Sequence, residues 1–509
     1  MDNSRTINTI RNATVNLAAR MCTMICAFVI RTIFLKYFGE QYTGVSTLFT
    51  DILNILSFTE LGIGAAISYA FYKPVAQGDD LRIAQLMKLC KYIYRIISVS
   101  VLLIGLAFTP FIGYFVKNVP DIKESITEIY LLYVIKTSLS YLLIYKSTLI
   151  IAKQKQYVVT ATESAIVLAK TILDVFLLII SKNFMVYLYI EIVSILITNL
   201  VISILANREL NGAVPPKNVK IHRNDFKSLF KNVKDVFIYK INGIVLNSTD
   251  SLIISNAIDI STVTYISNYN LIFNAINNIA YQIISALTAS VGNLAILKTQ
   301  KEQQDVFETI NFLCFSFSSI VITGLWLCTN PFIEIIWGKQ YVLSTGIVLL
   351  LCANLYITIM YMAVDIFRMA NGIFHKGRLR PLVTAILNLI ISIIAVRYLG
   401  LLGVLLGTVL SRMLTQVWYD PKLVFNIVFQ GSVKPYYLKY NIYTFTIILC
   451  CICGSFIENL INANALISLV VGFIFAILIN ILAISIFYKK TTEYAAVIKY
   501  LKNIFKIHN

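Results

Sequence analysis

Charged residues are scarce in this sequence. They make up 13% of the 509 residues, whereas 58% are hydrophobic, and a soluble globular domain carries about 25% charged residues. This deficit excludes a water-soluble globule. Histidine is almost absent, and the three that occur, His222, His375 and His508, fall in polar segments. The sequence therefore offers no histidine-based acid–base pair inside an apolar segment.

Motifs for metal and nucleotide chemistry are also missing. The nine cysteines are scattered through apolar runs, and none has the spacing of a zinc site or a disulfide framework. No glycine-rich phosphate-binding loop is present. We therefore expect no cofactor and no metal. A membrane enzyme, such as a polysaccharide polymerase, is the less favoured class because the predicted external loops are short.

Long apolar runs are what the sequence has in abundance. We count about fourteen runs long enough to cross a bilayer as helices, from 13–35 and 45–71 at the start to 441–461 and 464–487 at the end. A β-barrel would show shorter segments of alternating hydrophobicity. The predicted fold class is an all-α integral membrane protein.

Positive charge predicts the orientation of these helices. The net charge is +18, from 43 Lys and Arg against 25 Asp and Glu, and most basic residues fall in loops on one side of the predicted membrane. The positive-inside rule places that side, and with it both termini, in the cytoplasm. Because topology explains the charge, we do not expect nucleic acid as a partner.

A polar linker divides the chain. The segment 207–234 contains Pro215, Pro216 and several basic residues, and it separates a predicted six-helix bundle at 1–206 from a second one at 235–420. Residues 421–509 add an amphipathic connector, two further helices and a basic tail. A weak repeat at an offset of about 220 residues relates the two bundles and aligns Arg20 with Lys240. An even number of spans per half makes the repeat parallel, as in several transporters.

Cations inside the apolar runs are the first candidates for function, because a charge at membrane depth is costly without a partner or a wet cavity. Span one carries Arg20 and Arg31. We predict Arg20 as a substrate contact and Arg31 as a gate or structural anchor; the alternative is that both reach the membrane surfaces. Lys136 and Lys146 have no acid on their own helix and are favoured for an anionic substrate. The predicted substrate-binding set is Arg20, Lys136, Lys146, Lys170 and Lys240.

Acids in the same runs are candidates for ion coupling. Lys170 and Asp174 are four residues apart, and Glu163 shares their helix face, so a structural ion pair is as well supported there as ligand contact. Asp51 and Glu60 lie on nearly opposite faces of one helix and cannot form one site. The predicted ion-coupling set is Asp51, Glu60, Glu163, Asp174 and Asp250.

A polar stripe runs along span eight. Its members recur at three- and four-residue steps: Ser267, Asn270, Asn274, Asn277 and Tyr281. Amides and hydroxyls suit the hydrogen-bonding groups of a sugar. They equally suit contacts between membrane helices, and both interpretations stay open.

Several blocks of sequence resemble a known family. The segments RTIFLKYFG (Arg31 to Gly39) and LFTDILNILSFTELGIGAAISYAFYKP (Leu48 to Pro74) closely resemble the opening of bacterial polysaccharide-repeat flippases. These are the Wzx-type exporters of the multidrug/oligosaccharidyl-lipid/polysaccharide (MOP) superfamily. In the second half, Asp250 to Phe273 and Asn330 to Val342 look similar to the same family.

This resemblance implies a V-shaped transporter of two six-helix bundles plus a C-terminal helix pair. It implies flipping of undecaprenyl-diphosphate-linked oligosaccharide across the bacterial cytoplasmic membrane by alternating access, coupled to a Na⁺ or H⁺ gradient or to membrane potential, for O-antigen (lipopolysaccharide), capsule or exopolysaccharide synthesis. Polysaccharide polymerase machinery is an expected partner. The alternatives are a lipid II flippase, which also has a cationic cavity, and a drug/cation antiporter, which should have fewer spans and an acidic cavity.

Overall fold

The computed structural model describes residues 3–57, 63–116, 120–209, 248–285, 287–288, 291–292, 299–373, 377, 379–461 and 464–506. These residues form helices joined by short turns, and no strand occurs among them. The predicted all-α class is confirmed. The chain divides into two compact units, Met1–Thr264 and Tyr265–Asn509, which we describe separately. The predicted six-helix bundles at 1–206 and 235–420 remain a prediction.

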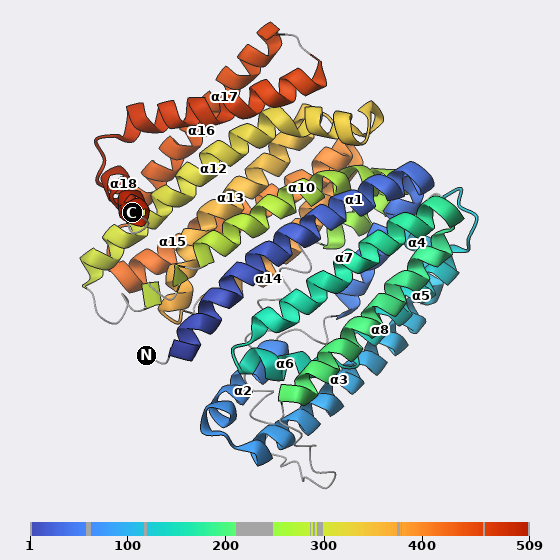
Figure 1. Ribbon diagram of the computed structural model, residues 1–509. Helices are drawn as coiled ribbons and strands as arrows, with labels where there is room; N and C mark the ends of the chain where they lie inside the picture. Colours follow the sequence, from blue (N-terminus) through green and yellow to red (C-terminus); the bar gives the residue numbers. More distant parts are fainter. Residues whose placement is uncertain are drawn as a thin grey trace. The chain divides into compact units, whose positions relative to one another are not determined.

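The first unit is built from seven main helices in the part that the structure describes. They are α1 (Asn3–Leu56), α2 (Ile63–Gln77), α3 (Asp80–Phe108), α5 (Ile126–Tyr141), α6 (Tyr145–Ala152), α7 (Gln156–Ser181) and α8 (Phe184–Glu209), with the short α4 (Ile112–Phe115) after α3. Neighbouring pairs include α1 with α7, α3 with α5, and α7 with α8 (Figure 1). Asp79 caps α3 by accepting a hydrogen bond from the backbone N–H of Arg82 at 2.9 Å, as expected of an N-cap.

The α1 segment contains two of the predicted spans, joined by a sharp turn at Gly39. Its backbone has φ 76° and ψ −168°, a region open essentially to glycine alone. Before the turn, Asn12 bonds to Gln154 and Tyr157 where α7 begins, and the Phe34 ring contacts Phe184 just beyond the end of α7. The first half of α1 therefore runs the length of α7.

After the turn the chain runs back. Tyr42 donates a hydrogen bond to Glu124, shortly before α5 begins, at 2.5 Å. Phe49 then contacts Tyr130 and Tyr133 further along α5. The two halves of α1 are thus separate spans, as the sequence predicts.

Residues 248–257 are helical and pack with the first unit. The Ser255 hydroxyl donates to the backbone oxygen of Phe115 at 2.6 Å. Thr264 donates to the backbone oxygen of Glu40 at 2.5 Å. A Cβ on Gly44 would lie 2.2 Å from the backbone oxygen of Ile260, so glycine is required where these segments cross.

The second unit contains longer helices. They are α10 (Ile260–Ser285, from residue 265 on), α12 (Gln300–Ile336), α13 (Thr345–Ala370), α14 (Arg380–Leu399), α15 (Leu401–Val424), a π-helical turn (Phe425–Phe429), α16 (Lys434–Ile461), α17 (Ala465–Tyr488) and α18 (Thr492–Lys506). A capping box between Thr299 and Glu302 starts α12, which satisfies two backbone donors reciprocally. In Figure 1, α16 and α17 lie beside α12.

Small and polar residues bring α14 and α15 together. Asn388 donates to Thr408 at 3.0 Å, and Thr384 and Thr415 lie 2.7 Å apart. A Cβ on Gly407 would meet the Ser392 side-chain oxygen at 2.1 Å. Close backbone approach and interhelical hydrogen bonds are how helices associate in lipid, where the hydrophobic effect between them is missing.

Eleven helices in the described part are long and apolar enough to cross a membrane. One of them, Thr14–Leu56, holds two predicted spans; α10 is not among the eleven, because its asparagines lower its hydropathy. Large apolar side chains such as Tyr398, Phe445 and Leu460 face outward. Apolar surface on this scale marks contact with lipid, and the chain is a multi-pass membrane protein.

Candidate functional site

Four charged side chains meet between α5, α7 and α8, and we call them the charge cluster: Lys136, Lys170, Asp174 and Glu191. Lys136 Nζ lies 2.8 Å from Glu191 Oε2. Lys170 forms an ion pair with Glu191 Oε1 and a second one with Asp174 at 3.2 Å. Glu191 thus holds one lysine on each carboxylate oxygen. Asp174 is completely buried, and the other three side chains are between 13% and 24% exposed.

Aromatic rings and a third cation surround the charge cluster. The Lys136 ammonium lies 5.1 Å from the centre of the Tyr133 ring, and that of Lys170 lies 5.7 Å from the Tyr187 ring. Both distances fit cation–π attraction. Arg31 of α1 interacts electrostatically with the same two tyrosines. Three cations, Lys136, Lys170 and Arg31, therefore lie near two carboxylates, those of Asp174 and Glu191.

The structure brings together some of the predicted site residues and separates others. Lys170 and Asp174 form the ion pair that their spacing favours. Lys136, favoured for an anionic substrate because no acid was expected on its own helix, pairs with Glu191 of another helix. Glu163 is exposed. The sequence reasoning omitted Glu191 from the site, although an acid inside the apolar run of α8 was a signal that it pairs with a cation elsewhere.

Two of the remaining predicted cations, Lys146 and Arg20, lie apart from the charge cluster. Lys146 of α6 donates to the Ser203 hydroxyl at 2.5 Å and to the Asn207 side-chain oxygen at 3.1 Å; both partners are neutral. Arg20 is exposed on α1. Lys240 lies outside the described residues.

Asp51 forms a second polar site in the first unit. Its carboxylate accepts a hydrogen bond from the Ser251 hydroxyl at 2.5 Å, and the side chains of Ser248 and Asn54 also hydrogen-bond to it. These three partners are neutral. Asp250 lies next to Ser251 and is half-buried. Glu60 lies outside the described residues.

The predicted asparagine stripe follows one face of α10. Asn270, Asn274 and Tyr281 are exposed and Asn277 is half-buried. Ser267 instead points into the unit and is buried. The exposed part of the stripe is therefore available to a ligand or to another helix, and the two interpretations remain alternatives.

A second buried ionic network lies at one end of α13, α14 and α15. Asp420 is fully buried and accepts contacts from Arg380 at 2.7 Å and Arg368 at 3.3 Å. Tyr361 donates a hydrogen bond to the same carboxylate oxygen at 2.7 Å. Asp365 pairs with Arg368 at 2.7 Å. Two arginines balance two aspartates, so this network holds three helices together.

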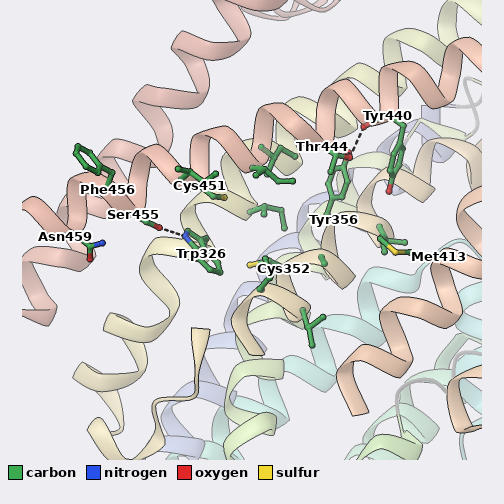
Figure 2. Close-up of a pocket in the computed structure, with 18 residues that line it drawn as sticks. Trp326, Cys352, Tyr356, Met413, Tyr440, Thr444, Cys451, Ser455, Phe456 and Asn459 are labelled. Atoms are coloured by element: carbon green, nitrogen blue, oxygen red, sulfur yellow. Dashed lines mark hydrogen bonds between the residues drawn. The ribbon is translucent and has the colours of Figure 1, made fainter. Parts of the chain in front are cut away.

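The second unit also has two apolar grooves. One, about 690 Å³ in volume, lies between α12, α13, α15 and α16 (Figure 2). Several of the polar groups that line it are already hydrogen-bonded to one another. Trp326 donates to the Ser455 hydroxyl at 2.7 Å, and the hydroxyls of Tyr356 and Thr444 lie 3.0 Å apart. The other groove, about 700 Å³, lies between α10, α12 and α17. Both suit hydrocarbon rather than a polar ligand.

Comparisons with known proteins identify the fold. No protein-family model matches the sequence, and a search of curated proteins gives no significant match. The chain is similar to a solved structure of the lipid II flippase MurJ in an inward closed conformation, with 15% identity and a TM-score of 0.67 over 95% of this chain and 99% of that chain. It is similar to an inward-facing multidrug resistance MATE family transporter, with 13% identity and a TM-score of 0.60 over 81% and 98%. A MOP superfamily transporter from Pyrococcus furiosus, described as having a binding pocket of reverse polarity, aligns at 12% identity and a TM-score of 0.53 over 84% and 96%. The chain therefore has the fold of MOP superfamily transporters.

Proposed function

We propose that this protein flips undecaprenyl-diphosphate-linked oligosaccharide repeat units across the bacterial cytoplasmic membrane, for the synthesis of O-antigen, capsule or exopolysaccharide. The observation that carries this proposal is the charge cluster with Arg31 beside it. Three cations gather here, partly buried among apolar helices, and offer several charged donors to phosphate oxygens. Such a site attracts a diphosphate more strongly than it would in water.

Each part of such a substrate finds matching chemistry in the chain. The diphosphate suits the lysines and Arg31. The sugar suits the exposed amides of Asn270 and Asn274 on α10. The isoprenoid chain stays in lipid or lies along the apolar grooves of the second unit.

Asp51 is the residue we propose for ion coupling. Its hydrogen-bond partners Ser251, Ser248 and Asn54 are neutral, so binding a proton or Na⁺ would not break an ion pair. Asp174, by contrast, is already paired with Lys170. Alternating access of the two bundles would then be driven by the ion gradient, with both termini in the cytoplasm.

The direct test is deletion of the gene in the native host. Lipid-linked repeat units should accumulate on the cytoplasmic leaflet, and surface polysaccharide should fall. Complementation with Arg20→Ala should restore export only in part, at an unchanged amount of protein in the membrane. Unchanged surface polysaccharide together with altered drug sensitivity would contradict the proposal and favour a drug antiporter.

The second candidate function is lipid II flipping, which the similarity to the MurJ structure favours. The two functions differ in their phenotype. A lipid II flippase should rescue cells depleted of their own lipid II flippase, whereas a repeat-unit flippase should restore only surface polysaccharide. Measuring growth and polysaccharide in the same strains separates them.

A further inference from the structure

Glu191 occupies the position in the charge cluster where an anion would bind. Each of its carboxylate oxygens faces one lysine, Oε2 towards Lys136 and Oε1 towards Lys170. A phosphate group offers the same arrangement, because its oxygens accept charge-assisted hydrogen bonds from two ammonium groups at once. The carboxylate and a phosphate therefore compete for the same donors.

We propose that Glu191 is a built-in competitor of the anionic headgroup, which binds by displacing its carboxylate from Lys136. This inference rests on the proposed function and adds a residue that sets how tightly the headgroup is held. Lys136 is the entry point because it is the more exposed of the two lysines, at 24% against 14%. Lys170 keeps a second acidic partner in Asp174 and stays anchored when Glu191 leaves.

The charges around the site fit this exchange. Glu191 interacts with Lys136 and Tyr133 of α5, with Lys170 and Asp174 of α7, and with Tyr187 of its own helix, and Arg31 interacts electrostatically with the two tyrosines. With the Glu191 carboxylate withdrawn, Lys136 and Lys170 are left with the single carboxylate of Asp174. The charge of the four-residue cluster then rises by one unit, which favours a diphosphate.

The competition has a use in transport. A site that bound a diphosphate with all of its cations would hold the headgroup tightly and release it slowly. The Glu191 carboxylate on α8 competes for Lys136 and so lowers the affinity of the site for the headgroup. It also pairs with the lysine again once the headgroup has left. Glu191 thereby favours release over retention.

The test is binding of farnesyl diphosphate to the purified full-length protein in lipid nanodiscs, with farnesol as the uncharged control. Glu191→Gln should bind the diphosphate at least about tenfold more tightly than the wild type, because a competing charge has been removed from the cations. Farnesyl diphosphate should also raise the thermal midpoint of this variant more than that of the wild type. Glu128→Gln, an exposed acid in the first turn of α5, is the matched control and should behave as the wild type.

Three outcomes separate the possible failures. Binding to the wild type with unchanged or weaker binding to Glu191→Gln would overturn the competitor role and leave the proposed function standing. No binding to either protein would overturn both. If Glu191→Gln does not fold, Glu191→Asp keeps the charge but shortens the side chain. That variant should bind more tightly than the wild type, and equal or weaker binding would overturn the competitor role.

Discussion

Lys136 Nζ lies 2.8 Å from Glu191 Oε2, although the two residues stand on different helices, α5 and α8. The contact makes Lys136, whose own helix carries its acid, Glu128, only in the exposed first turn, half of an interhelical ion pair. Its charge is therefore both a structural contact and a potential ligand for an anion, and variants must separate the two roles.

Lys136→Ala should reduce both stability and export. The change removes one of the two lysines that pair with Glu191 and should lower the free energy of unfolding by about 1–3 kcal/mol, between the values for exposed and buried ion pairs. The thermal midpoint in detergent and the amount of exported polysaccharide measure the two effects. The double variant Lys136→Glu/Glu191→Lys restores the ion pair but moves the ammonium group from α5 to α8, where it is no longer placed to bind the ligand. The double variant should therefore regain thermal stability to a greater extent than it regains polysaccharide export. Equal recovery of both would show that the pair is purely structural.

Gly39→Ala should destabilise the turn inside α1. Any side chain at φ 76° and ψ −168° costs about 1–3 kcal/mol, even though a Cβ there would meet no atom within 4 Å. The cost is thus conformational rather than steric. Gly113→Ala is the control, because Gly113 lies in α4 and also has open space around it. If both changes lowered the thermal midpoint equally, the conformational cost of a side chain at residue 39 would be contradicted.

Gly407→Ala should separate α14 from α15. The new methyl group would lie 2.8 Å from the backbone nitrogen of Ser392, and overpacking of this kind costs about 1–3 kcal/mol. Gly324→Ala is the control, since its Cβ would meet Ala476 at an ordinary 3.8 Å. Thermal unfolding of the two variants should differ clearly; similar midpoints would contradict close packing at Gly407.

Asp420→Asn should be among the most destabilising single changes in the second unit. It leaves Arg368 and Arg380 in a buried site with one carboxylate fewer, and breaking a buried pair costs about 3–5 kcal/mol. Asp365→Asn should cost less, because that side chain is 34% exposed. The yield of folded protein and the thermal midpoint provide the measurement, and a larger effect for Asp365→Asn would refute the ranking.

Docking of α18 should weaken in acid. Burial raises the pKa of Glu493, but the hydrogen bond and charge of Lys439 outweigh burial and hold that pKa below its ordinary value of 4.5. A lowered pKa gives stability that is present above pH 4.5 and is lost as the pH falls through the lowered value. Glu493→Gln should therefore be less stable than the wild type at neutral pH, with the difference shrinking below pH 4.5. The rate of proteolysis within α18, measured for both proteins across this pH range, tests the prediction. A difference in rate between Glu493→Gln and the wild type that does not change with pH would contradict the ion pair.

The local pattern of the sequence determined much of this protein. Runs of apolar residues specified the spans, because each backbone group in a bilayer must be paired within its own helix. Gly39 marked the turn between the first two spans, and the i,i+4 spacing of Lys170 and Asp174 specified their ion pair. These features depend on residues close together in the chain.

Only the tertiary structure decided which distant residues meet. Glu191 joins Lys136 and Lys170 because α5, α7 and α8 pack together, and no spacing along one helix contains that information. Arg380 follows a loop in sequence, yet it is buried against Asp420 of α15. The sequence by itself determined how many charges lie in the membrane, and packing between helices decided which of them neutralise one another, because Coulomb attraction depends on distances in space.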